Sequence, residues 1–130
     1  MTAIRSHMDL DVWKMSMDFV DELYNITDTF PSSEKFGLAS QLRRAGVSIP
    51  SNIAEGAGRF YEKEFIQFLY ISMGSLSEVE TQLEIAKRRG YIYSIEPQIT
   101  TMIRIRKMIN GLIKQLRNAC STHYMQFQME

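Results

Sequence analysis

The chain has 130 residues, of which 45% are hydrophobic and 23% are charged, and its formal net charge is zero. This length and composition predict one soluble globular domain that spans residues 1–130. The zero charge argues against a protein that binds polyanions over its whole surface. No apolar run approaches the roughly 20 residues that a membrane span needs, so we expect no membrane partner.

The single cysteine and the chain ends bear on the compartment. Cys120 cannot form an internal disulfide, and residues 1–8 contain no apolar signal region. A reducing cytoplasm is the simplest compartment for such a chain. Residues 124–130 show no clear apolar period, and we expect these residues and residues 1–8 to be flexible ends.

The first predicted helix spans residues 11–30. Its apolar residues recur at alternating steps of four and three, the spacing of a helix-bundle seam. A second apolar stripe lies about 100° away around the same helix, and it consists of Trp13, Met17, Val20 and Tyr24. The combined apolar surface is wider than one bundle core needs, so we predict that this stripe contacts another subunit.

The second predicted helix spans residues 33–56, with Ser32 or Ser33 as its N-cap. Pro50 falls inside its apolar pattern, where the missing N–H frees the carbonyl of Gly46 and the proline ring crowds that carbonyl. We therefore predict a kink at Pro50, with nearby serine and asparagine side chains or water satisfying the freed group.

The third and fourth predicted helices span residues 62–89 and 95–123. Gly74 interrupts the third helix and costs roughly 1 kcal/mol relative to alanine. This glycine indicates either a close backbone approach or a tolerated weakness. Four helices joined by short connections predict an all-α fold, an antiparallel up-down-up-down four-helix bundle.

Residues for metal or covalent chemistry are scarce. The only histidines are His7 and His123, and neither follows a glutamate at the spacing of a di-iron motif. One cysteine and two distant histidines do not make a zinc site, and no strand precedes a glycine-rich phosphate loop. We therefore predict no metal, no cofactor, no catalytic residue and no small-molecule substrate, and hence a protein that is not an enzyme.

A polar stripe follows one face of the second helix, because its members recur at steps of four or three. Its members are Arg44, Ser48, Asn52, Glu55 and Arg59. One interpretation is a solvated face that also satisfies the proline kink. The other is a network that faces another subunit or a ligand.

Charge is distributed unevenly along the chain. Residues 1–34 contain two basic and seven acidic residues, whereas residues 84–130 contain eight basic and three acidic ones. One interpretation is that an acidic first helix lies beside a basic last helix. The other is a basic surface that binds nucleic acid, for which the candidate residues are Arg43, Lys63, Arg104, Lys107 and Lys114.

Several motifs together resemble a known family. They are DVWK at residues 11–14, FP at 30–31, the stretch 41–59, KEF at 63–65 and GSL at 74–76. This pattern is similar to the four-helix-bundle proteins encoded in bacterial 23S rRNA intervening sequences. That family has two alanines after its paired arginines, where this chain has Ala45 and Gly46.

The resemblance implies an antiparallel four-helix bundle that assembles as a ring of five. It also relates the chain to the accessory protein of diversity-generating retroelements, a pentamer that works with a reverse transcriptase and nucleic acid. The first functional hypothesis is therefore a homo-oligomer, most simply a homopentamer, that is associated with RNA or DNA. The alternative is a protein-interaction scaffold that binds no nucleic acid.

Overall fold

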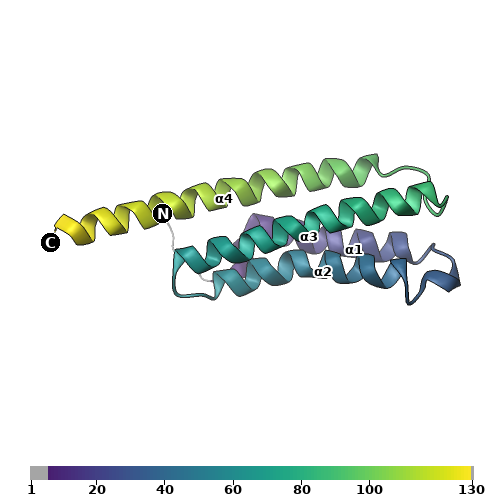
Figure 1. Cartoon of the computed structure of the whole chain (residues 1–130), viewed down its shortest axis with the longest axis horizontal. Coiled ribbons are helices and arrows are strands. Elements are labelled where there is room, and N and C mark those ends of the chain that lie inside the picture. The colour runs from purple at the N-terminus through teal and green to yellow at the C-terminus, as the bar shows by residue number, and fades with distance from the viewer. Residues whose placement is uncertain (1–5, 130) are drawn as a thin grey trace.

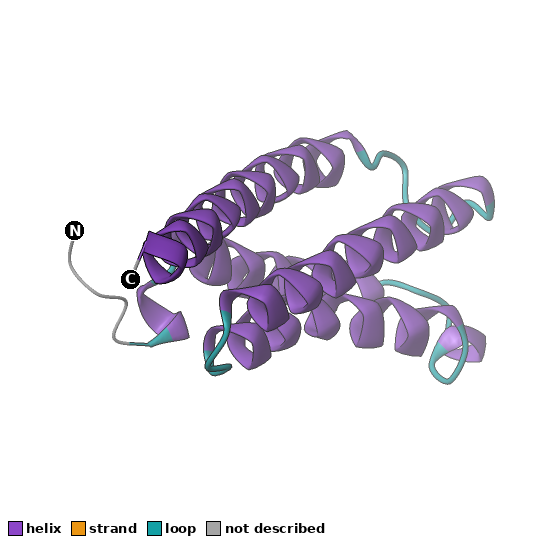
Figure 2. Cartoon of the chain, turned by 60° about the vertical axis from the view of Figure 1, so that its left-hand side comes forward, coloured by secondary structure: helices purple, strands orange, loops and turns teal. Residues whose placement is uncertain are grey.

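The computed structural model describes the backbone of residues 6–129 and the side chains of residues 6–119. This part of the chain folds into four long helices and two short 3-10 helices, with no strand among its residues (Figure 2). The elements in chain order are η1 (His7–Asp9), α1 (Asp11–Thr27), η2 (Ser32–Glu34), α2 (Leu38–Ala57), α3 (Glu62–Arg88) and α4 (Glu96–Met129). The prediction of an all-α protein with four helices is confirmed.

The helices form an elongated bundle. The chain direction reverses at each of the three connections, and α4 extends past the ends of the other helices (Figure 1). Within the described residues, α2 packs against α1 and α3, and α4 packs mainly on α3 with a smaller contact to α1. The two diagonal pairs, α1 with α3 and α2 with α4, make no such contact among these residues. Each helix therefore has two neighbours, as in an up-down-up-down bundle.

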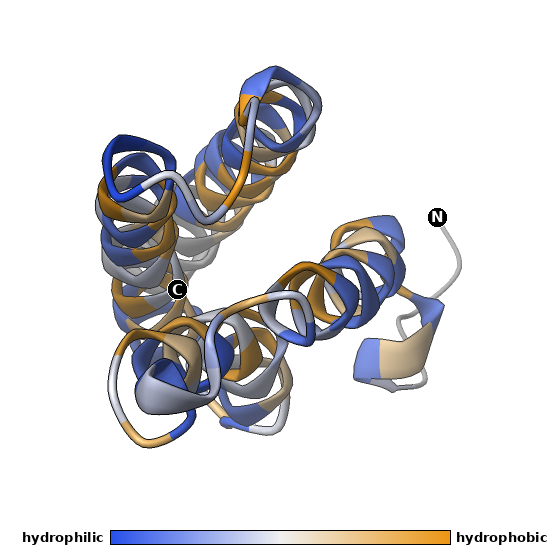
Figure 3. Ribbon diagram, turned by 90° about the vertical axis from the view of Figure 1, so that its right-hand side faces the viewer, coloured by the Kyte–Doolittle hydropathy of each residue, from blue (hydrophilic) through white to orange (hydrophobic). Residues whose placement is uncertain are grey.

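The buried core follows the predicted seams. Apolar (orange) and polar (blue) residues alternate along each helical ribbon in Figure 3, and burial of each apolar side chain contributes about 1.5–3 kcal/mol. Fully buried examples are Leu23, Leu42, Ile49, Leu76, Leu83, Ile105 and Ile109. Two seam serines are also buried, and each satisfies its hydroxyl by donating to a carbonyl. Ser16 donates to Val12 (2.7 Å) and Ser72 donates to Ile49 (2.9 Å).

The second helix begins later than the sequence predicts. The backbone of Gly37 leaves the helical region, so α2 begins at Leu38, and Ser32 and Ser33 lie in a separate 3-10 helix. The Glu34 carboxylate replaces the predicted serine cap, because its Oε1 accepts from the N–H of Leu38 at 3.2 Å. Its Oε2 accepts from the Tyr91 hydroxyl at 2.8 Å, which links the first connection to the last.

The structure describes only part of the two predicted flexible ends. Residues 1–5 and 130 lie outside the described residues, and η1 at the start of the described part packs against α1 and α2. Residues 7–9 form η1, and the backbone of α4 continues as helix from the predicted end near 123 to Met129.

Glycines mark two different environments in α2 and α3. A methyl group on Gly56 would come within 2.7 Å of Phe65 and 2.9 Å of Phe68, so this glycine permits the close approach of α3. Gly46 similarly leaves room for Leu23, since an added Cβ would lie 2.6 Å from its Cδ1. Gly74 meets nothing within 4 Å, so of the two predicted interpretations the tolerated weakness fits this subunit.

A matched pair of alanine substitutions tests these environments. Gly74→Ala should stabilise the fold by about 0.5–1 kcal/mol, because helix propensity improves in open space. Gly56→Ala should destabilise it by roughly 1–3 kcal/mol, because the new methyl group overpacks the contact with α3. Urea unfolding measures both changes. Equal effects of the two substitutions would contradict the proposed close approach at Gly56.

The Glu34–Tyr91 contact predicts a dependence of stability on pH. The hydrogen bond from the Tyr91 hydroxyl, followed by that from the Leu38 N–H, holds the pKa of Glu34 below its ordinary value of 4.5. The stabilisation is therefore present above the unfolded pKa and is lost as the pH falls through the lower, folded pKa. As the pH falls from about 6 to about 3, the Glu34→Gln variant should lose less stability than the wild type loses. Parallel thermal-melting curves of the two proteins over this range would contradict the prediction.

Candidate oligomer and nucleic-acid interfaces

An apolar groove of about 290 Å³ lies between α1 and α2. Three of the four predicted interface residues form one wall. The lining residues are Trp13, Met17 and Val20 of α1, with Val47, Pro50, Ser51 and Ala54 of α2. Met17 is 40% exposed and Val47 is 38% exposed, so the groove opens to solvent. Exposed apolar surface of this kind is typical of an interaction site.

The fourth residue of the predicted stripe, Tyr24, has a different neighbour. The guanidinium of Arg43 lies 4.7 Å from the centre of its ring. The same arginine donates from Nε to Thr27 at 2.8 Å and from Nη2 to the carboxylate of Asp28 at 2.7 Å. Arg43, which the sequence offered as a nucleic-acid contact, is therefore held by contacts within the chain and ties α2 to the end of α1.

The predicted polar stripe divides into an inner and an outer part. Ser48 and Asn52 are half-buried, and the Asn52 amide donates to both the carbonyl (2.8 Å) and the hydroxyl (2.9 Å) of Ser48. The Ser75 hydroxyl on α3 also donates to the Ser48 hydroxyl at 2.8 Å. The inner part therefore joins α2 to α3 beside Pro50, which lies inside an unbroken α2. The predicted kink at this proline stays a prediction.

The outer members of the stripe are exposed. Arg59 pairs with Glu55 at 3.8 Å, and its guanidinium lies 4.9 Å from the ring centre of Phe68. Arg44 contributes to a slot of about 290 Å³ between α2 and α3. Gln82 also lines this slot, and its side-chain oxygen is buried without a hydrogen-bond partner among the described residues.

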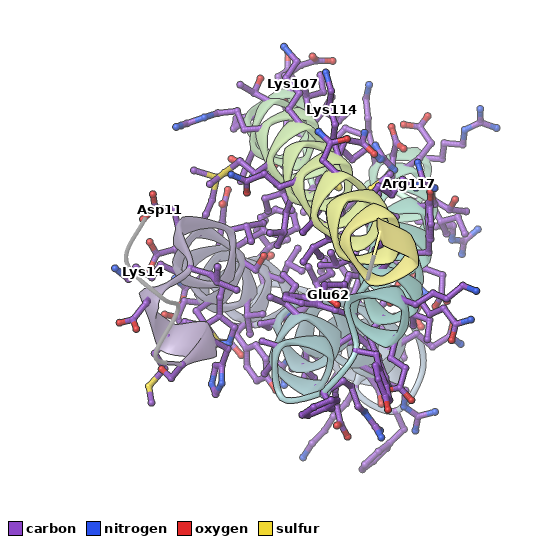
Figure 4. The ribbon with its side chains drawn as sticks, turned by 90° about the vertical axis from the view of Figure 1, so that its left-hand side faces the viewer. Asp11, Lys14, Glu62, Lys107, Lys114 and Arg117 are labelled. Carbon is purple, nitrogen blue, oxygen red and sulfur yellow. The ribbon has the colours of Figure 1, made fainter. Side chains whose placement is uncertain are left out.

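The outer side of α4 carries cations that are not paired. Arg104, Lys107 and Lys114 are exposed, and none of them forms an ion pair among the described side chains. Figure 4 shows Lys107 and Lys114 projecting from the outer side of α4. No aspartate or glutamate occurs in the sequence between Glu96 and Glu130. A positive potential therefore develops along the part of α4 that follows Glu96.

The other arginines of α4 contact α3. Arg106 lies 3.5 Å from the carboxylate of Glu80 and donates to the Ser77 hydroxyl at 3.1 Å, and Arg117 donates to the Tyr70 hydroxyl. Toward α1, the Gln98 amide donates to Glu22 at 2.8 Å. The acidic α1 and the basic α4 therefore do lie side by side, as one interpretation of the sequence expects. Among the described side chains, the ion pair that α4 forms is with Glu80 of α3.

Lys63 lies apart from the α4 cations. It is exposed in the first turn of α3, next to the connection that carries Arg59. The structure therefore does not assemble the five predicted nucleic-acid candidates into one surface. It gathers Arg104, Lys107 and Lys114 on α4 and separates them from Lys63 and Arg43.

Sequence reasoning missed the α2 wall of the groove. Val47, Pro50 and Ala54 recur three and four residues apart, which is the spacing of one helix face. The ion pair of Arg43 with Asp28 has no comparable signal, because the partners lie 15 positions apart on different helices.

The described residues offer neither a metal-binding cluster nor a membrane-spanning helix. Among them, no group of three or more histidine, cysteine, aspartate or glutamate side chains could hold a metal ion. In the same part of the chain, no helix combines the length and the apolar character needed to cross a bilayer.

The fold and these surfaces define the class of the protein, a four-helix protein with an apolar groove between two helices and a basic outer helix. The chain belongs to the 23S rRNA-intervening sequence protein family, whose model matches residues 8–121. The sequence resemblance is thereby confirmed.

A solved structure shares the fold. It is a protein of unknown function from the S23 ribosomal protein family of Bacteroides thetaiotaomicron, with 25% identity and a TM-score of 0.59. The similarity covers 83% of this chain and 96% of that chain. No curated protein matches the chain. Neither description names an enzymatic activity.

Proposed function

We propose that this protein is a non-enzymatic homo-oligomer that binds RNA or DNA through phosphate contacts and without sequence specificity. The α1–α2 groove forms the subunit interface, and the assembly is a ring of five, as the family resemblance implies. The outer side of α4 contacts the nucleic acid. A protein-interaction scaffold is the second candidate, because the same groove could hold a different protein.

The observation that carries the nucleic-acid proposal is the set of free cations on α4. Arg104, Lys107 and Lys114 are exposed and make no ion pair among the described side chains. Lysine and arginine in this state gain affinity for phosphates by releasing condensed counterions. A ring repeats the surface in every subunit, so individually weak contacts add through avidity.

The observation that carries the oligomer proposal is the apolar groove. Met17 and Val47 expose apolar side chains on its two walls. A second subunit that packs here would remove this surface from water, which stabilises an assembly by roughly 25 cal/mol for each Å² buried. Cyclic symmetry repeats such a contact without leaving an open end.

Charge in the groove should dissociate the assembly. Val47→Glu places a carboxylate on the exposed part of the α2 wall, and Trp13→Glu places one on the α1 wall, at a half-buried side chain. Light scattering should give about 75 kDa for a wild-type pentamer of 15.1 kDa subunits and a smaller mass for both variants. Ile103→Glu is the matched control, because Ile103 is a similarly exposed apolar residue on α4, outside the groove. A monomeric wild type would overturn the proposal.

Removal of the α4 cations should weaken binding to duplex DNA and reduce its dependence on salt. Joint replacement of Arg104, Lys107 and Lys114 by glutamine should reduce the slope of log K against log salt by up to roughly 2.7, at about 0.9 per phosphate contact. Fluorescence anisotropy over a salt series measures both quantities.

The matched control for this variant replaces Lys14, Arg44 and Arg59 by glutamine. It makes the same change in charge away from α4, so it should leave the slope nearly unchanged. Equal effects of the two triple variants would show that only net charge matters. No binding of the wild type to RNA or DNA at low salt would favour the scaffold.

A further inference from the structure

One end of the bundle exposes two aromatic side chains almost completely. Phe36, in the connection between α1 and α2, is 90% exposed, and Tyr93, in the connection between α3 and α4, is 97% exposed. Neither ring contributes to the core or lines the α1–α2 groove. Both connections lie at the end that faces the viewer in Figure 3. The two rings therefore lie almost wholly in solvent at one end of the molecule.

Tertiary contacts hold the two connections together. The Tyr91 hydroxyl donates to Glu34 at 2.8 Å, and the rings of Phe30 and Tyr91 have their centres 5.5 Å apart. Phe36 and Tyr93 each follow one partner of the hydrogen bond by two residues, which is at most roughly 7 Å of chain. Both exposed rings are thus anchored close to one fixed point.

Cations lie beside the two exposed rings. Three cations are available, and the ammonium of Lys35 lies 5.5 Å from the ring centre of Phe36. The other two are Lys87 and Arg89, both exposed at the end of α3. We call Phe36, Tyr93, Lys35, Lys87 and Arg89 the aromatic end.

The carboxylates near the aromatic end are mostly engaged. Glu34 accepts from Tyr91 and from the Leu38 N–H. Glu84 pairs with Arg88 at 3.2 Å, and Asp28 pairs with Arg43 at 2.7 Å. The donors to Glu34 are neutral, so this carboxylate keeps its charge. Within residues 28–37 and 84–96 the pairs therefore leave Glu34 and Glu96 against the three cations, an excess of one positive charge. A polyanion with flat, exposed groups therefore complements this surface in both charge and shape.

We propose that the aromatic end binds single-stranded nucleic acid, with bases stacked on Phe36 and Tyr93 and phosphates held by Lys35, Lys87 and Arg89. The proposal rests on the proposed function and deepens it. It adds a site that distinguishes a single strand, whose bases are free to stack, from a duplex, whose bases already stack on one another. The cations of α4 contact phosphates of either form.

The test compares single-stranded RNA of roughly 20 nucleotides, long enough for a stacking site, with duplex DNA of the same length. The double variant Phe36→Leu and Tyr93→Leu keeps apolar side chains but removes both planar rings. Fluorescence anisotropy should show about a tenfold or greater loss of affinity for the single strand and unchanged affinity for the duplex. Circular dichroism checks that the fold is retained, as the exposure of both rings predicts.

Two controls isolate stacking. Phe36→Trp with Tyr93→Phe restores aromatic rings, so single-strand affinity should return to the wild-type value. Phe60→Leu with Tyr61→Leu removes two exposed rings from the connection between α2 and α3, at the opposite end of the bundle in Figure 1. This control pair should bind like the wild type.

The outcomes separate this inference from the proposed function. Unchanged single-strand binding in the leucine variant, or an equal loss for single strand and duplex, overturns stacking at the aromatic end. If the α4 glutamine variant is still impaired in that case, the proposed function stands. A selective loss in the leucine variant with no effect of the α4 variant supports the aromatic end and overturns the role of α4. Absence of binding by the wild type overturns both.

Discussion

The close contact between α2 and α3 is the constraint on which the other features depend. Gly56 allows α3 to approach because it presents no side chain to Phe65. Hydroxyl groups replace apolar contacts further along the interface, where Ser72 donates to the carbonyl of Ile49 and Ser75 donates to Ser48. These bonds fall beside Pro50, where the helix lacks one backbone N–H. Hydrogen bonds between the two helices therefore support α2 at the position where its own backbone hydrogen bonding is interrupted.

This constraint also determines what α2 presents on its other side. With the polar face of α2 bound to α3, the face that carries Val47, Pro50 and Ala54 turns toward α1 and solvent. Leu23 of α1 packs over Gly46, and Arg43 bonds to the end of α1. The groove thus has two walls fixed by contacts within one chain. Such a surface loses little conformational entropy when a partner binds to it.

Apolar periodicity predicted the four helices and most of the core, because burial repeats with the helical period. It predicted less well the features that depend on contacts between distant residues. The start of α2 is set by Gly37 and by the bonds of Glu34 to Leu38 and Tyr91, the second of which spans 57 positions. The apolar stripe on the first helix predicted the α1 wall of the groove. The sequence did not predict that this wall faces α2, because that pairing depends on how the two helices pack.

A net charge of zero remains compatible with nucleic-acid binding because charges act over short distances in salt. At physiological ionic strength the screening length is about 8 Å, so acidic residues on another face do not cancel the field of α4. No acidic residue occurs between Glu96, the first residue of α4, and Glu130. Glu80 of α3 pairs with Arg106 and leaves the charges of Arg104 and Lys107 uncompensated. The arrangement of charge on α4, rather than its total over the chain, therefore determines whether a phosphate backbone is attracted.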